Sequence, residues 1–189
     1  MFGNLSTNRQ LKRLRDDKCL DIVPFDDELL KPTGYTLNPG RVLRRSSEGV
    51  WDDVHNFSRR KEIFVLQPNE YVVVEPRQIV RISAEGIVGR FVTSSNNIES
   101  GLLVTAGQID SKYGMSGEAL RFGVKNLLDA QNYLRHDTRL VHIEIFDLRG
   151  STADPTAPSR SQDETWRSRR RDPKWERDDS DGPSHEGGD

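Results

Sequence analysis

The chain has 189 residues, of which 33% are hydrophobic and 31% charged, and its formal net charge at pH 7 is −2. This composition predicts one globular domain with an additional polar segment, and the charge gives no general reason to bind nucleic acid. The single cysteine, Cys19, excludes a disulfide within the chain, and no apolar run is long enough to span a membrane. The N-terminus lacks a signal-peptide core, so we expect a cytoplasmic protein.

The N-terminal segment predicts one short amphipathic helix. Ser6 or Thr7 can supply the N-cap, because a hydroxyl accepts a hydrogen bond from the free backbone N–H groups of the first turn. The helix would run to about Lys18 and place Leu11 and Leu14 on one face. Basic side chains surround that face and acidic ones follow, so we interpret the basic surface as solvated rather than nucleic-acid-binding.

Short strands separated by turn residues follow. The segments with strand character are residues 20–25, 34–37, 63–66, 71–75, 76–82 and 87–92. Residues 39–40, Pro-Gly, predict a turn, and residues 41–61 are polar and irregular, which predicts a long loop or arm. Strands and turns recur about every ten residues, a spacing typical of an all-β barrel or sandwich.

The last apolar segment, residues 140–148, alternates with a period of two and closes the predicted domain at about residue 150. One set of side chains in it is Leu140, His142 and Glu144, and the other is Val141, Ile143 and Ile145.

The composition changes at residue 151. Residues 151–189 contain no Leu, Ile, Val, Met or Phe, so they cannot bury enough apolar surface to offset their ordering entropy. We therefore predict a β domain over residues 1–150 and a charged disordered tail over residues 151–189. The basic run at residues 167–171, beside Trp166, could contact RNA or an acidic partner, but the acidic residues around it favour a self-screened polyampholyte.

The stretch that organises the domain is residues 89–126. An apolar run leads to a polar Ser94-Ser95 turn, and a second apolar run leads to Gln108 and Asp110. The carboxylate of Asp110 thus stands at the tip of a β-element. Taken alone, Asp110 is either a turn-former that bonds its own backbone or a functional group.

The order of the motifs resembles the core of the dCTP deaminase/dUTPase superfamily. The matching motifs are S-S at 94–95, G-L-L-V at 101–104, A-G-Q-I-D at 106–110, Tyr113 and Asn126. Three further segments resemble the deaminase branch: L-S-T-N-R-Q-L at 5–11, L-D-I-V-P-F through Y-T-L-N-P-G at 20–40, and R-L-V-H-I-E-I-F-D-L at 139–148. The resemblance covers roughly residues 5–148 in collinear order.

The resemblance implies a dUTPase-like distorted β-barrel, or β-clip, that forms a homotrimer with sites at subunit interfaces. The ligand would be a pyrimidine deoxynucleoside triphosphate, with Mg²⁺ held mainly by the triphosphate rather than by protein ligands. Ser94 and Ser95 match the phosphate-binding turn, and Asp110 matches the acid that orients water in dUTPases. Gln108, Tyr113 and His142 complete the nucleotide-binding residues that we expect.

Several positions depart from the family pattern. The deaminase branch uses a glutamate as proton shuttle, and that position is Gly123 or Phe122 here, neither of which can titrate. The arginine before the serine pair is Thr93. The family's "Y-D-L" aspartate is Thr36, and the glutamine of the last strand is His142.

Three functions remain open from the sequence. The first is a dCTP deaminase-like protein of pyrimidine deoxynucleotide metabolism that binds dCTP or dUTP and catalyses deamination or diphosphate hydrolysis. The second is a non-catalytic trimeric relative that binds a nucleotide or a protein. The third, an RNA-associated barrel that uses the tail, has the least support. Zinc and Walker-type motifs are absent from the sequence.

Overall fold

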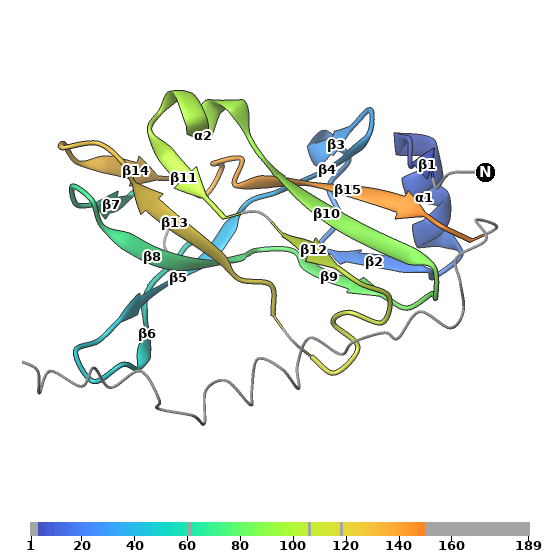
Figure 1. Ribbon diagram of the computed structural model, residues 1–189, viewed down its shortest axis with the longest axis horizontal. Coiled ribbons are helices and arrows are strands. Elements are labelled where there is room, and N and C mark those ends of the chain that lie inside the picture. The colour runs from blue at the N-terminus through green and yellow to red at the C-terminus, as the bar shows by residue number, and fades with distance from the viewer. Residues whose placement is uncertain (1–3, 60–61, 106, 118, 150–189) are drawn as a thin grey trace, which may run out of the picture. The chain divides into compact units, whose positions relative to one another are not determined.

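The computed structural model describes residues 4–59, 62–105, 107–117 and 119–149. The predicted tail, with Trp166 and residues 167–171, lies outside the described residues. The domain is mainly β and contains two larger sheets, two two-stranded sheets and short helices (Figure 1). Within this part of the chain, none of the helices has the length and apolar character needed to cross a bilayer.

The helices are α1 (Asn8–Asp16), the 3-10 turn η1 (Asp27–Leu29) and α2 (Ser95–Glu99). The strands are β1 (Asn4–Leu5), β2 (Leu20–Val23), β3 (Leu30–Lys31), β4 (Gly34–Leu37), β5 (Pro39–Arg45), β6 (Trp51–Asn56), β7 (Phe64–Leu66), β8 (Tyr71–Pro76), β9 (Ile79–Ile82), β10 (Ile87–Thr93), β11 (Leu102–Val104), β12 (Gln108–Ile109), β13 (Phe122–Asn126), β14 (Asn132–Leu134) and β15 (Val141–Asp147).

Helix α1 begins at the predicted cap. Thr7 and Gln10 form a reciprocal capping box, in which the Thr7 hydroxyl accepts from the Gln10 backbone N–H and the Gln10 side chain accepts from that of Thr7. Leu11 and Leu14 are buried, Arg9, Lys12 and Arg13 are exposed, and Arg15 is half-buried with its guanidinium over the Phe25 ring. The predicted helix is therefore confirmed.

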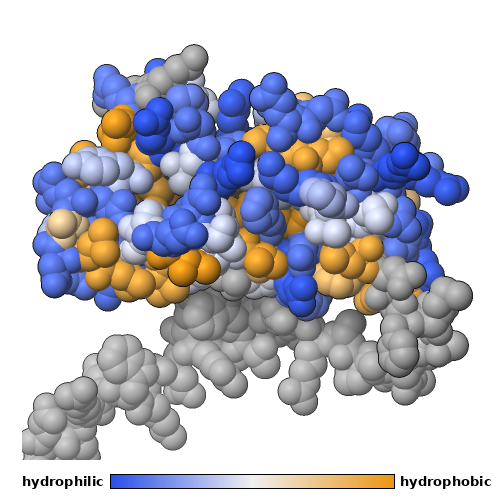
Figure 2. All heavy atoms as spheres, turned by 90° about the horizontal axis from the view of Figure 1, so that it is seen from above, coloured by the Kyte–Doolittle hydropathy of each residue, from blue (hydrophilic) through white to orange (hydrophobic). Residues whose placement is uncertain are grey.

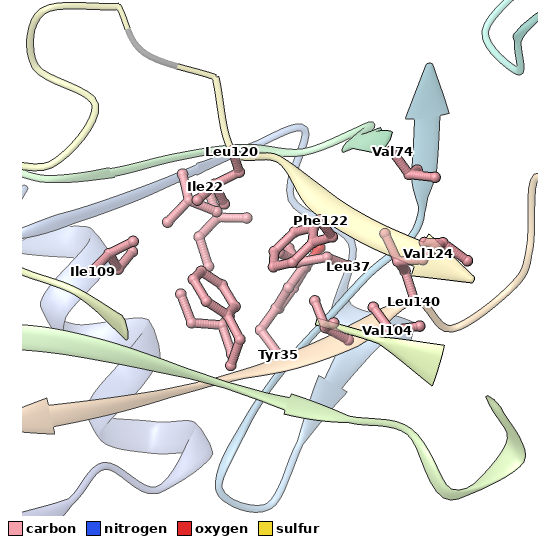
Figure 3. Close-up of a cluster of buried hydrophobic side chains, with 14 of the residues drawn as sticks. Ile22, Tyr35, Leu37, Val74, Val104, Ile109, Leu120, Phe122, Val124 and Leu140 are labelled. Carbon is pink, nitrogen blue, oxygen red and sulfur yellow. The ribbon is translucent and has the colours of Figure 1, made fainter. Parts of the chain in front are cut away.

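The two larger sheets face each other. One has the order β12-β10-β15-β4-β3, with β1 added beside β15, and the other has the order β11-β13-β8-β5-β6. Inward side chains of both sheets form the core: Tyr35 and Leu37 of β4 face Phe122 and Val124 of β13 (Figure 3). Burial of these apolar surfaces is the main force that holds the sheets together.

Strand β15 follows the predicted alternation. Val141, Ile143 and Ile145 are fully buried, whereas His142 and Glu144 on the opposite face are partly exposed. Leu140, which the sequence grouped with His142 and Glu144, is instead fully buried, because it precedes the strand and its backbone N–H donates to the Leu37 carbonyl.

The predicted loop at residues 41–61 is wrong. Strands β5 and β6 pair there as an antiparallel hairpin, and β5 also pairs with β8. Pro39 and Gly40, predicted as a turn, begin β5 instead. The hairpin was missed because β6 is an edge strand whose first four side chains, from Trp51 to Val54, are exposed, so its sequence shows no apolar alternation.

The predicted Ser94-Ser95 turn is also wrong. Ser94 is the N-cap residue of α2, which begins at Ser95. Buried Asn97 fixes this short helix, because its side-chain amide donates to the backbone carbonyls of Arg139 and Leu140. Serine is common both at N-caps and in turns, because its short hydroxyl can bond nearby backbone groups in either. The sequence alone therefore did not distinguish a helix start from a turn.

Candidate functional site

Gln108 and Asp110 form an exposed polar pair at the end of β12. The Gln108 amide Nε2 donates to Asp110 Oδ1 at 2.9 Å, and both side chains are exposed. They lie on one face because side chains two residues apart in an extended segment point the same way. Tyr113 follows in the turn, where its backbone N–H donates to the Asp110 carbonyl at 3.2 Å and its side chain packs on the core.

An arginine that the sequence did not single out stands beside this pair. Strand β10 pairs with β12 so that Arg90 lies directly opposite Gln108. The Arg90 guanidinium binds the Glu144 carboxylate, with 2.6 Å between Nη2 and Oε2. The guanidinium of Arg90, held by Glu144, therefore lies on the strand next to Gln108, on the same face of the sheet. Only the outward parity of Arg90 in its strand could have indicated this from the sequence.

The serine pair lies at the far end of β10. Ser95 is exposed in the first turn of α2, whereas Ser94 is 97% buried and only its backbone carbonyl serves the helix. Asp110 falls opposite Val88, by extension of the strand register. Roughly six residues of strand, about 20 Å, therefore separate Asp110 from Ser94. The serine pair and the acid do not converge within one subunit.

His142 lies on the same outward sheet face as Arg90. It pairs with Val92 on one side and Thr36 on the other, and its Nδ1 is 3.0 Å from the Thr36 hydroxyl oxygen. Thr36 and His142, which both differ from the family pattern, are thus within hydrogen-bonding distance of each other. Two strand spacings and a two-residue offset place His142 about 12 Å from Gln108.

The environment of His142 disfavours its charged form. Burial lowers the pKa of the imidazole, and the positive charges of Lys31 and Arg139 lower it further, against the opposing effect of Glu144. The neutral ring is therefore the form that the fold accommodates.

This shift predicts a pH-dependent stability. Between the unfolded value of about 6.5 and the lower folded pKa, the unfolded chain binds more protons at this site. The free energy of unfolding should therefore fall as the pH drops from above 6.5 through the folded pKa. Urea unfolding between about pH 5 and 8 measures this, with His142→Gln as the comparison. An equally steep decline in the variant would assign the effect to other groups.

The two candidate positions for the family's proton shuttle, Phe122 and Gly123, lie on opposite faces of β13. Phe122 is buried and packs edge-on against Phe91, with ring centroids 4.9 Å apart, so it belongs to the core. Gly123 has the opposite parity, and a Cβ atom there would clash with the Tyr71 hydroxyl oxygen and lie 2.8 Å from Cε2 of the same ring. The Tyr71 ring thus occupies the space into which a side chain at position 123 would extend. Tyr71 was not identified from the sequence.

Within the described ranges, no three side chains of His, Cys, Asp or Glu lie close enough together to hold a metal ion. Asp110 instead offers a single exposed carboxylate, which suits a hard cation whose other ligands come from a phosphate chain.

Comparison with solved structures supports the predicted fold. The chain superposes on the 2'-deoxycytidine 5'-triphosphate deaminase of Agrobacterium tumefaciens with a TM-score of 0.61 and 10% sequence identity. The match covers 78% of this chain and 49% of the deaminase, so the chain spans about half the length of that protein.

Two phage enzymes give weaker matches. The dUTPase of phage phi11 of S. aureus has a TM-score of 0.45, and the dUTPase of Staphylococcus bacteriophage 80alpha has 0.44; each is 17% identical. The matches cover 67% and 68% of this chain and 88% and 89% of those chains. No protein-family model matches the sequence, and none of the curated proteins does either. The superposition on the deaminase of Agrobacterium tumefaciens shows that the chain shares the β fold of that protein.

Proposed function

We propose that the chain is a dCTP deaminase-like protein of pyrimidine deoxynucleotide metabolism that binds dCTP or dUTP. The observation that carries this proposal is the exposed Gln108–Asp110 pair with Arg90 opposite it, on a fold shared with a dCTP deaminase. An amide and a carboxylate on one edge can read the polar groups of a nucleotide, and a guanidinium can neutralise phosphate charge. The single cysteine agrees with a cytoplasmic location.

Asp110 is the proposed catalytic residue if the protein turns over its ligand. Its exposed carboxylate can accept a hydrogen bond from water and orient that water toward a phosphate, which supports diphosphate hydrolysis. Mg²⁺, bound through the triphosphate, would neutralise phosphate charge when present. Deamination has less support, because no titratable side chain occupies position 123.

The distance between Ser95 and Asp110 makes one subunit insufficient, so we propose a homotrimer with shared sites. Four exposed apolar side chains lie around Gly101, at the end of β13 and beside α2: Ile98, Leu103, Leu127 and Leu128. Hydrophobic atoms also reach the surface among hydrophilic ones on the side viewed in Figure 2. Grouped exposed apolar residues mark interaction surfaces. Light scattering should give three times the chain mass of 21.6 kDa.

Turnover tests the enzymatic form of this proposal. Purified protein is incubated with dCTP or dUTP and Mg²⁺, and the products are separated by ion exchange. We expect monophosphate release, and Asp110→Asn should lower its rate about 10²-fold, because the amide cannot accept a proton from water. Asp137→Asn is the matched control, since Asp137 is an exposed carboxylate in a turn. Equal rates in wild type and Asp110→Asn would contradict the role of Asp110.

The second candidate is a non-catalytic trimer that binds a nucleotide or a protein. The contact between Gly123 and Tyr71 favours it, because that contact fills the place of a deaminase's proton shuttle. Calorimetry with dCTP and dUTP separates the two candidates. Saturable binding without product supports the non-catalytic candidate, and monophosphate release excludes it.

A further inference from the structure

A cavity with charged, polar and apolar lining opens beside strands β5, β8 and β9, and neither Gln108 nor Asp110 lines it. Its volume is about 300 Å³, and its lining includes Arg41 of β5, Asn56, Ser58, and Glu75 and Arg77 at the end of β8. This is the size of a small-molecule site. Three arginines and one buried carboxylate meet at or beside it, and the proposed function uses none of them.

Glu75 is the central group. Its side chain is only 6% exposed, and it is bound from two sides. Arg41 Nε donates to Glu75 Oε2 at 2.9 Å, and Arg41 Nη2 approaches the same oxygen. Arg121 Nε donates to Glu75 Oε1 at 3.1 Å. One carboxylate therefore orients two guanidinium groups.

Such an arrangement is a weak source of stability, because removing a carboxylate from water costs several kcal/mol. Its clearer consequence is preorganisation, since each guanidinium is held in one orientation while part of it remains accessible. The Arg41 and Arg121 side chains are 48% and 57% exposed.

The arginines at and beside the cavity have more N–H donors than the neighbouring carboxylates accept. Arg121 Nη1 and Nη2, and the whole Arg77 guanidinium, make no hydrogen bond or ion pair with any side chain or backbone group in the described ranges. The second carboxylate nearby, Asp53, is 3.9 Å from Arg41 Nη1 and is itself 42% exposed. Among the described residues, three arginines thus face two carboxylates, Glu75 and Asp53, and the excess charge of these five groups is positive.

We propose that this cavity, which is lined by Arg41, Glu75 and Arg77 and has Arg121 paired with Glu75 beside it, binds a small anion through a phosphate or carboxylate group. The forked donors of arginine match both groups, and the lining also includes the polar side chains of Asn56 and Ser58 and the apolar ones of Ile79, Val80 and Leu120. Glu75 acts as a positioning residue that aims Arg41 and Arg121, and Arg77 supplies the unpaired charge.

The test is calorimetric titration of the full-length protein at low ionic strength, with inorganic phosphate in one arm and acetate in the other. We expect saturable binding of at least one probe. Arg77→Gln should weaken that binding about tenfold or more, because a charge-assisted contact is lost. The Arg77 side chain is exposed, so this variant should keep the thermal unfolding midpoint of the wild type.

Arg81→Gln is the matched control. It removes the same charge from nearby β9, but Arg81 is paired with Asp21 and does not line this cavity. Its affinity for the probe should stay within about twofold of wild type. No saturable binding of either probe, or equal losses in Arg77→Gln and Arg81→Gln, would overturn the proposal. Asp110→Asn should leave probe binding unchanged, which separates this site from the nucleotide site.

Discussion

The double variant Arg41→Gln/Arg121→Gln is expected to lose about 3–5 kcal/mol of unfolding free energy. Both charge partners of Glu75 disappear in this variant, and a carboxylate whose side chain is 6% exposed in the native chain is left without a guanidinium. A buried ionised carboxylate without a cation is strongly unfavourable, so the folded state loses stability. Urea denaturation at pH 7 measures the loss.

Adding Glu75→Gln to that variant should restore most of the lost stability. Replacing a whole buried ion network by neutral groups is often close to neutral, whereas removing only one sign of charge is not. The matched control is Arg13→Gln/Arg135→Gln, which removes two arginines from exposed ion pairs and should cost less than about 1 kcal/mol. Equal losses in the two double variants would show that burial of Glu75 has no energetic consequence.

The sequence predicted the elements that bury one face in the core and expose the other to solvent. Strand β15 shows this, since its alternation matches a sheet with one face in the core. Helix α1 was predicted from its cap residue and its two leucines. The hairpin of β5 and β6 escaped because an edge strand is held by backbone hydrogen bonds, which leave no hydrophobic pattern in the sequence.

The candidate site was predictable only in part. Asp110 could be placed at the end of a β-element, because apolar runs and turn residues surround it in the sequence. Its separation from Ser94 depends on strand register, which pairs β10 with β12 near residues 89–90 rather than near the serines. Arg90 and Tyr71 could not be identified, since their importance comes from neighbours on other strands.

Thr36 and His142 illustrate how departures from a family pattern combine. In the sequence they are separate substitutions, more than a hundred positions apart. In the fold they are register partners whose side chains lie within hydrogen-bonding distance, 3.0 Å. A neutral histidine can donate to or accept from a hydroxyl, so each residue satisfies the other. A histidine that was a candidate ligand-binding residue thus also has a structural partner.

The variant Gly123→Glu/Tyr71→Ala is expected to gain deamination of dCTP, where the wild type and Gly123→Glu lack it. The motif resemblance puts the deaminase proton shuttle at Gly123 or Phe122, and of these Gly123 is chosen because Phe122 belongs to the core. A general acid–base there contributes about 10²–10⁴-fold to rate. In the single variant Gly123→Glu the new side chain meets the Tyr71 ring, whose Cε2 lies 2.8 Å from the position of the new Cβ. Uracil-nucleotide formation from dCTP, measured by ion exchange, reports the gain.

Stability separates the steric part of this prediction from the catalytic part. Gly123→Glu alone should lose about 1–3 kcal/mol through overpacking against Tyr71, and the added Tyr71→Ala should return part of that loss. Tyr71 is 49% exposed, so Tyr71→Ala by itself should be mild and serves as the control. If the losses of unfolding free energy of the two single variants simply add in the double variant, Tyr71 does not hinder a side chain at position 123. A coupled but inactive double variant would instead show that this face of β13 does not receive the base of the nucleotide, because the shuttle would then be present without a substrate to protonate.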